Sequence, residues 1–116
     1  MVEVLEPGTV QIRLQEHRAV RNHLRSVHAV ALTNLGELAT GLATLTALPT
    51  GVRGIVTQLS TRYHAKARGR LTARCSVRVP KDLDEAELTA ETEIQDESGT
   101  VVATVTAHWR TRVEAR

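Results

Sequence analysis

The chain has 116 residues, a hydrophobic content of 41% and a formal net charge of +2. A single domain over residues 1–116 fits this length, because a chain of this size buries roughly two-thirds of its unfolded surface. The small net charge and the scarcity of aromatic residues exclude a general nucleic-acid-binding protein, which would need a basic surface and aromatic stacking platforms. The single Cys75 excludes an internal disulfide, and no apolar run of about 20 residues predicts a membrane span, so we expect a cytoplasmic protein.

The first predicted element is a β-hairpin. Apolar and polar residues alternate over residues 9–14, residues 2–5 form the partner strand, and Glu6-Pro7-Gly8 supplies the turn. Residues 15–27 have no clear period and are rich in Arg and His. We therefore expect a loop there that is polar enough to belong to a site.

One long helix is predicted over residues 27–45. Its apolar residues follow a 4-3-4-3 spacing, which is typical of a helix with one buried face, and Pro49 and Gly51 end it. The expected buried stripe consists of Ala31, Leu35, Leu38, Leu42 and Leu45. The less apolar side carries Thr33, Asn34, Glu37, Thr40 and Gly41, so one carboxylate is expected to face away from the core.

Four strands are predicted after Gly54, because the apolar residues then alternate with period two over residues 55–63, 71–79, 86–94 and 101–109. The linkers are short enough for hairpins, which favours an antiparallel meander. A hairpin closing at residues 80–85 would place Arg78 opposite Glu87 and Arg74 opposite Glu91. The order of elements predicts an α+β fold in which a curled antiparallel sheet of five to six strands wraps around one long helix.

The segment from Asn22 to Gly41 reads NHLRSVHAVALTNLGELATG. It resembles the motif of hotdog-fold acyl-CoA thioesterases of the phenylacetate-pathway type, which have Asn or Gln in a loop, His-Gly-Gly at the helix start and Asp or Glu two turns later. Asn22 precedes Glu37 by fifteen residues and Ala29 precedes it by eight, as in that family. Residues 63–73 also resemble the family's next strand-turn-strand segment. The resemblance implies a hotdog fold and, as the leading function, hydrolysis of a fatty-acyl or aryl thioester.

The resemblance assigns the chemistry to four residues. The backbone N–H of Ala29, at the positive end of the helix, would stabilise the developing oxyanion. Glu37 would act as general base or nucleophile, Asn22 would orient the water or the carbonyl, and His28 would shape the helix start. Ala29 and Val30 replace the two glycines of the family's motif. Backbone donation survives this change, whereas two side chains narrow the approach of substrate.

Further residues are expected to contact the acyl thioester, namely Val30, Asn34, Thr40, Gly41 and Thr61. The resemblance also implies that Lys66 and Arg68, in the basic turn after Tyr63, bind the phosphates of CoA. CoA enters as part of the substrate, and we expect no separate cofactor and no metal, because the histidines are too scattered for a ligand set. Cys75 lies on an apolar strand face, which indicates a packed thiol.

The resemblance implies a homodimer or homotetramer, in which the helix start of one subunit meets Glu37 of another. We expect no nucleic-acid or membrane partner. Two other functions remain open: a non-catalytic acyl-CoA-binding protein, and a hydratase-dehydratase that acts on enoyl or hydroxyacyl thioesters. The sequence identifies neither the acyl group nor its carrier, which is CoA or an acyl-carrier protein.

Overall fold

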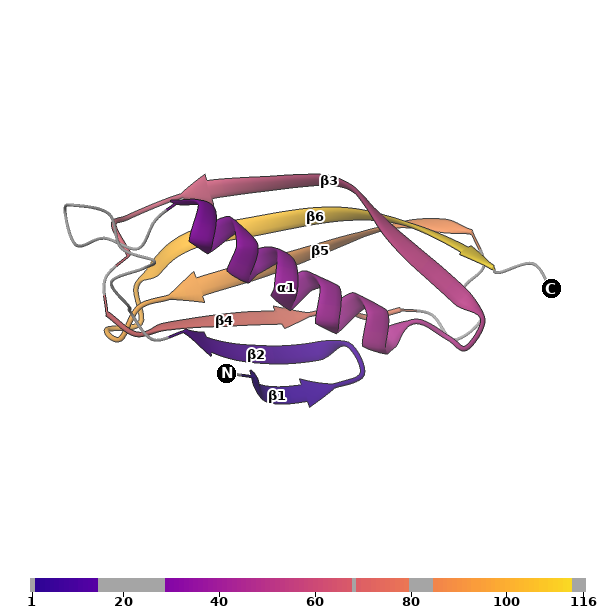
Figure 1. Cartoon of the computed structure of the whole chain (residues 1–116), viewed down its shortest axis with the longest axis horizontal. Coiled ribbons are helices and arrows are strands. Elements are labelled where there is room, and N and C mark those ends of the chain that lie inside the picture. The colour runs from indigo at the N-terminus through magenta and orange to yellow at the C-terminus, as the bar shows by residue number, and fades with distance from the viewer. Residues whose placement is uncertain (1, 15–28, 68, 80–84, 114–116) are drawn as a thin grey trace.

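The computed structural model of the chain describes residues 2–14, 29–67, 69–79 and 85–113, and Figure 1 shows its elements. They are β1 (Val2–Glu6), β2 (Thr9–Leu14), α1 (Ala29–Ala47), β3 (Val52–Tyr63), β4 (Leu71–Ser76), β5 (Ala86–Gln95) and β6 (Val101–Val113). The strands form one antiparallel sheet in the order β1-β2-β4-β5-β6-β3. The expected α+β architecture, one long helix with five to six strands, is confirmed.

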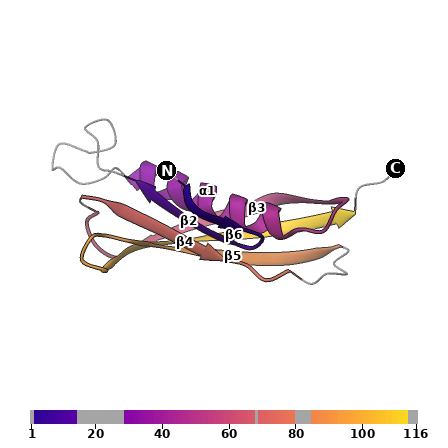
Figure 2. The ribbon, with the colours of Figure 1, turned by 90° about the horizontal axis from the view of Figure 1, so that it is seen from below.

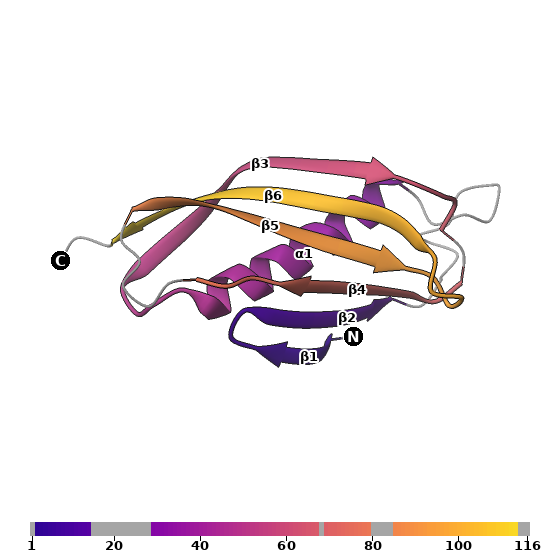
Figure 3. The same ribbon diagram turned by 180° about the vertical axis from the view of Figure 1, so that it is seen from behind.

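The sheet curls around α1, which crosses it diagonally from the end of β3 to the turn between β1 and β2 (Figure 1). The views from below and from behind show α1 on one face of the sheet, while no other element of the described chain covers the opposite face (Figures 2 and 3). Because α1 contacts all six strands, this single helix closes the core.

The predicted meander is wrong in one respect, because β3 does not pair with β4. Instead β3 pairs with β6, from Val52 opposite Val113 to Tyr63 opposite Ala103. The strand β4 has β2 on one side and β5 on the other, so it offers no edge to β3. The connection between β3 and β4 is therefore a crossover and not a hairpin, and β3 forms one edge of the sheet.

Small residues let α1 lie directly on the sheet. The side chain of Val105 fills the space that a Cβ on Gly36 would need. The hydroxyl of Thr92 donates to the Gly36 carbonyl at 3.5 Å, which ties β5 to the middle of the helix. The buried positions of α1 are Leu32, Leu35, Gly36, Ala39, Thr40, Ala43 and Thr44.

The predicted buried stripe of the helix is therefore partly wrong. Leu38 and Leu45 are 50% and 52% exposed, although their spacing placed them in the core. The buried face is rotated toward Ala39, Thr40, Ala43 and Thr44, since these smaller side chains allow the close approach of helix and sheet. The core itself is aliphatic and contains one aromatic ring, that of Trp109, which is 5% exposed.

The turn between β1 and β2 connects three parts of the molecule. Gly8 has a φ of +84°, in the left-handed region that glycine tolerates, and a Cβ there would overlap with the Val77 carbonyl oxygen. Val77 N–H donates to the Gly8 carbonyl at 2.6 Å, and Gly8 N–H donates to the Thr46 hydroxyl at 3.3 Å. The hairpin turn thus holds the chain after β4 and the last turn of α1.

The predicted charge pairs across β4 and β5 are wrong by two residues. Arg74 lies opposite Glu93 and not Glu91, and Arg78 lies beyond the end of β4. A shift of two residues keeps every side chain on its own face of the sheet, so the alternation that predicts the strands does not determine their register.

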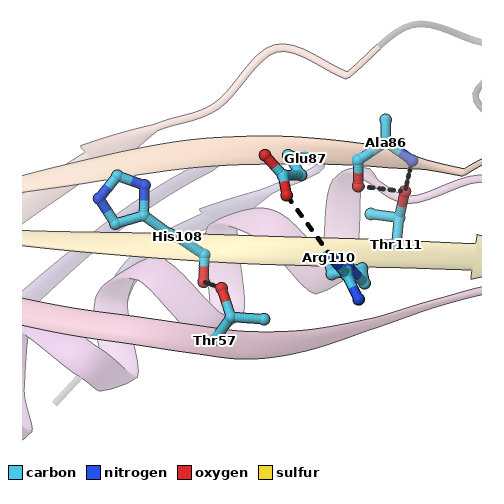
Figure 4. Close-up of polar contacts among 6 residues, drawn as sticks. All are labelled: Thr57, Ala86, Glu87, His108, Arg110 and Thr111. Atoms are coloured by element: carbon cyan, nitrogen blue, oxygen red, sulfur yellow. Dashed lines mark hydrogen bonds and ion pairs between the residues drawn. The ribbon is translucent and has the colours of Figure 1, made fainter.

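Polar contacts cover the face of the sheet that is remote from α1 (Figure 4). Glu87 of β5 lies 3.7 Å from Arg110 of β6, and the Thr57 hydroxyl of β3 donates to the His108 carbonyl at 3.1 Å. This outer face is therefore water-compatible, and the apolar interior lies under the helix. On the core-facing side of β6, the buried Thr111 hydroxyl accepts from Ala86 N–H at 3.1 Å and lies 3.2 Å from the Ala86 carbonyl.

Candidate functional site

The start of α1 is tied to the end of the edge strand β3 by three hydroxyl groups. Tyr63 Oη donates to the Ala29 carbonyl at 3.0 Å. Thr33 Oγ1 lies 2.9 Å from Tyr63 Oη and 2.8 Å from Thr61 Oγ1. Thr61 and Tyr63 point to the same side because they are two residues apart in a strand. These contacts fix the first turn of α1 against β3.

Ala29 is the first residue of α1 and is exposed. The first N–H groups of an α-helix have no acceptor within the helix, and they carry the positive end of the helix dipole. The first turn of α1 is therefore suited to hold a carbonyl oxygen that becomes negative during a reaction. Val30 follows in the same turn and contributes its backbone N–H to this positive end.

Glu37 is exposed and lies on the same side of α1 as Thr33, one turn further along. Within the described ranges, no hydrogen bond or ion pair engages its carboxylate. Eight residues separate Ala29 from Glu37, which is about 12 Å along a helix, so the two groups of one chain are too far apart to act on one carbonyl carbon.

The outward face of α1 carries two of the predicted contact residues, Asn34 before the exposed Leu38, and Gly41 between Leu38 and the exposed Leu45. A Cβ on Gly41 would meet nothing within 4 Å, so the surface is open at that point. Two half-exposed leucines on either side of a glycine make an apolar strip beside Glu37. An acyl group could lie on such a strip.

Thr40 does not belong to this surface. It was predicted to contact substrate, but its side chain is fully buried and its hydroxyl donates to the Glu37 carbonyl at 2.9 Å. Thr40 faces the sheet because the buried face of α1 is rotated from the predicted one. It helps to hold the turn that carries Glu37 and is not exposed on this outward face.

The remaining predicted residues are only partly placed. Thr61 is one of the three residues whose hydroxyl groups tie β3 to the start of α1. Lys66 is exposed in the connection that follows β3. Asn22, His28 and Arg68 lie outside the described residues. Tyr63 and Thr33 were not predicted as site residues, because only the fold brings the end of β3 to the start of α1. Strand alternation gave the direction of Tyr63 and helical periodicity that of Thr33, but neither gave the partner.

The buried thiol of Cys75 is not part of this candidate site. Burial raises the pKa of the Cys75 thiol, with a hydrogen bond to Thr92 acting against it, and the side chain is 2% exposed. The described ranges contain no group of three or more His, Cys, Asp and Glu side chains placed to hold a metal ion. They also contain no helix long and apolar enough to span a bilayer.

A curled antiparallel sheet wrapped around one helix defines the hotdog class of proteins, and comparison with known proteins gives the same result. Residues 1–111 match the family described as "Domain of unknown function (DUF4442)", and the chain belongs to this hotdog thioesterase-like family. The search of curated protein sequences found no match.

Solved structures extend the comparison. A Pseudomonas aeruginosa protein of unknown function, described as a probable thioesterase, is 30% identical with a TM-score of 0.84, over 96% of this chain and 80% of that one. A mutant thioesterase from Staphylococcus aureus is 17% identical, with a TM-score of 0.82 over 97% and 92% of the two chains. A hypothetical thioesterase from Streptococcus pneumoniae with coenzyme A is 17% identical, with a TM-score of 0.82 over 100% and 88%. The last two likenesses concern the fold.

Proposed function

We propose that the protein hydrolyses acyl-CoA thioesters in a site formed between two copies of the chain. The observation that carries the proposal is the arrangement of α1, which presents backbone donors at its start and the exposed carboxylate of Glu37 two turns later. The P. aeruginosa relative, described as a probable thioesterase, supports this class of reaction.

In this reaction the first turn of α1 holds the thioester oxygen. Glu37 removes a proton from water, and the resulting hydroxide attacks the carbonyl carbon. The N–H of Ala29 donates to the oxyanion of the tetrahedral intermediate. The intermediate then collapses, the C–S bond breaks, and the thiolate of CoA leaves and takes up the proton. Direct attack by Glu37, followed by hydrolysis of the anhydride, needs the same groups.

The distance between these groups favours a site that includes a second subunit. About 12 Å of helix separates Ala29 from Glu37 in one chain, so the carboxylate that works with one helix start comes from a partner. The edge strand β3 offers a route to this dimer, because in the described chain it pairs only with β6 and an edge strand presents unpaired backbone groups. Its Ile55 is 63% exposed.

Two features of the relatives support the proposed residues and ligand. In the S. aureus thioesterase, mutants with alanine in place of a glutamine and of a glutamate were solved, at positions fifteen residues apart in that protein. Asn22 and Glu37 have the same separation and matching side-chain chemistry. The S. pneumoniae structure contains coenzyme A, which favours a CoA ester, with Lys66 and Arg68 as the residues that would bind its phosphates.

The acyl group would lie along the outward face of α1. Leu38, Gly41 and Leu45 give this face its apolar character, and Asn34 gives it one polar group near the helix start. Such a strip accepts an aliphatic or aryl group of several carbons more readily than an acetyl group, which would leave most of it uncovered.

The experiment is a turnover assay with acetyl, medium-chain, long-chain and aryl CoA esters on the wild type, Glu37→Ala and Glu91→Ala. We expect kcat to fall by about a hundredfold or more in Glu37→Ala. Glu91→Ala is the matched control, since Glu91 is an exposed glutamate on the outer face of β5, and it should keep wild-type turnover. No turnover on any ester, combined with tight binding of CoA, would instead favour the non-catalytic acyl-CoA-binding protein.

A further inference from the structure

We propose that Tyr63 is a positioning residue for the site at the start of α1. It ends a chain of hydroxyl groups that runs from β3 to the backbone of Ala29 and orients the donors of the first helical turn. The inference rests on the proposed function where it concerns turnover, and on the contacts alone where it concerns the helix start.

The direction of the hydrogen bonds in this chain follows from chemistry. A carbonyl oxygen only accepts, so Tyr63 Oη must use its single proton on the Ala29 carbonyl, 3.0 Å away. Thr33 must then donate to Tyr63 Oη across 2.9 Å. Thr33 has no proton left for Thr61, so Thr61 donates to Thr33 across 2.8 Å. The donors therefore all point one way, from Thr61 through Thr33 and Tyr63 to Ala29.

Hydrogen bonds that run in one direction polarise one another, so the last donor is strengthened by those before it. The acceptor is the carbonyl of Ala29, and the N–H of the same peptide group belongs to Val30. A hydrogen bond to the carbonyl draws electrons toward its oxygen and makes the N–H of that peptide a better donor. The hydroxyl chain thus acts on the N–H of Val30, which follows the N–H of Ala29 in the turn that would hold the thioester oxygen.

The tyrosine ring is only half-buried, with 49% of the residue exposed. The two hydrogen bonds of its hydroxyl group join it to the helix start. Tyr63 also lies at the end of β3, which is an edge strand, so no strand on the far side restrains it within the described chain. Removal of the hydroxyl oxygen alone should therefore release the first turn while it leaves the core intact.

The experiment compares Tyr63→Phe, Thr33→Val and the double variant with the wild type, using Thr57→Val as control. Phenylalanine keeps the ring and removes only the hydroxyl group. Thr57 is on the same strand, but its hydroxyl donates to the His108 carbonyl of β6 and makes no contact with the start of α1 (Figure 4). Two quantities are measured, the steady-state kinetics on the best ester and the hydrogen exchange of backbone amides.

In Tyr63→Phe we expect kcat to fall about five- to twentyfold with KM changed less than twofold, because the donors act on the charge that develops in the transition state. The double variant should resemble Tyr63→Phe, since both substitutions break one chain at the same link. The amides of Thr33 and Asn34, whose helical acceptors are the carbonyls of Ala29 and Val30, should exchange about tenfold faster. Thr57→Val should match the wild type in both measurements.

Unchanged kcat and unchanged exchange at the helix start in Tyr63→Phe would overturn the inference. So would multiplied effects in the double variant, which would mean that the two hydroxyl groups act independently. If the wild type hydrolyses no ester, the proposed function fails, and the exchange of Thr33 and Asn34 still decides whether Tyr63 holds the helix start.

Discussion

Two glycines of α1 differ in what surrounds them, and the difference is testable. A methyl group on Gly36 would overlap with the Val105 side chain, whereas one on Gly41 would meet nothing within 4 Å. We expect Gly36→Ala to lower the free energy of unfolding by about 1–3 kcal/mol, because overpacking forces the helix off the sheet. Gly41→Ala should leave it unchanged or raise it by up to about 1 kcal/mol, because alanine favours helix.

Urea denaturation followed by the fluorescence of Trp109, the only tryptophan, measures both variants. Equal stability of Gly36→Ala and Gly41→Ala would contradict the close contact of helix and sheet.

Cys75 gives a second test at the scale of one side chain. Burial raises the pKa of its thiol, and the reactive species is the thiolate. We expect the native protein to react with a disulfide reagent at neutral pH at least a hundredfold more slowly than the protein unfolded in urea. The absorbance of the released thiolate reports the rate. Comparable rates in both states would mean that the strand around Cys75 opens readily.

Sequence reasoning at this scale succeeded where a residue's environment depends on local periodicity. The exposure of Glu37 follows from its place on the helix, and the burial of Cys75 and Trp109 follows from strand alternation. It failed for Leu38 and Leu45, because leucine spacing suggested a core stripe while the sheet requires small residues at the contact. Tertiary packing, which cannot be read from leucine spacing, decides whether the leucine face or the face of small residues packs on the sheet.

At the scale of elements, the turn between β5 and β6 depends on one carboxylate. Asp96 Oδ1 accepts from Ser98 N–H at 2.9 Å, from the Ser98 hydroxyl at 2.7 Å and from Thr100 N–H at 3.0 Å. These bonds, above all that of the Ser98 hydroxyl, lower the pKa of Asp96. A lowered pKa in the folded state means that the ionised turn stabilises the fold above the unfolded pKa of about 4, and that this contribution is lost as the pH falls below it.

We therefore expect Asp96→Asn to be less stable than the wild type at pH 7 and to approach it as the pH falls from 4 towards 2. Thermal unfolding across this pH range measures the difference, with Glu91→Gln as an exposed control on the preceding strand. A constant difference between Asp96→Asn and the wild type at every pH would rule out the carboxylate as the cause.

The order of the strands shows the limit of periodicity for whole elements. Alternation located five of the six strands, the Pro7-Gly8 turn located the first hairpin and with it β1, and the change of period located α1. It did not place β3 beside β6, because that pairing joins elements separated by two other strands. The short linker after Tyr63 suggested a hairpin, but β2 already occupies the edge of β4.

At the scale of the whole molecule, the central claim is that two chains build each site. The sequence motif supplied the residue types and their spacing, and eight residues of the predicted helix already place Ala29 and Glu37 of one chain about 12 Å apart. That distance, together with the edge strand β3, supports the proposed dimer, in which each helix start would work with the carboxylate of the other chain. A twofold dimer then contains two equivalent sites.

The measurement that tests this claim most directly mixes two inactive variants, Ala29→Pro and Glu37→Gln. Proline at the first position of a helix removes one N–H and is tolerated there, so Ala29→Pro deletes the backbone donor without breaking α1. Each variant alone should lose about a hundredfold or more in kcat while it stays dimeric. Unfolding and refolding an equal mixture makes half of the dimers mixed, and each mixed dimer has one site with both groups intact.

The account predicts that the refolded mixture has about one quarter of the wild-type activity on the best ester. Half of the dimers are mixed, and one of the two sites in each mixed dimer is intact. Native mass spectrometry of the same sample, with one variant isotopically labelled, shows whether mixed dimers have formed. Activity that stays at the level of the separate variants, in a sample with mixed dimers, would contradict a site shared between two chains.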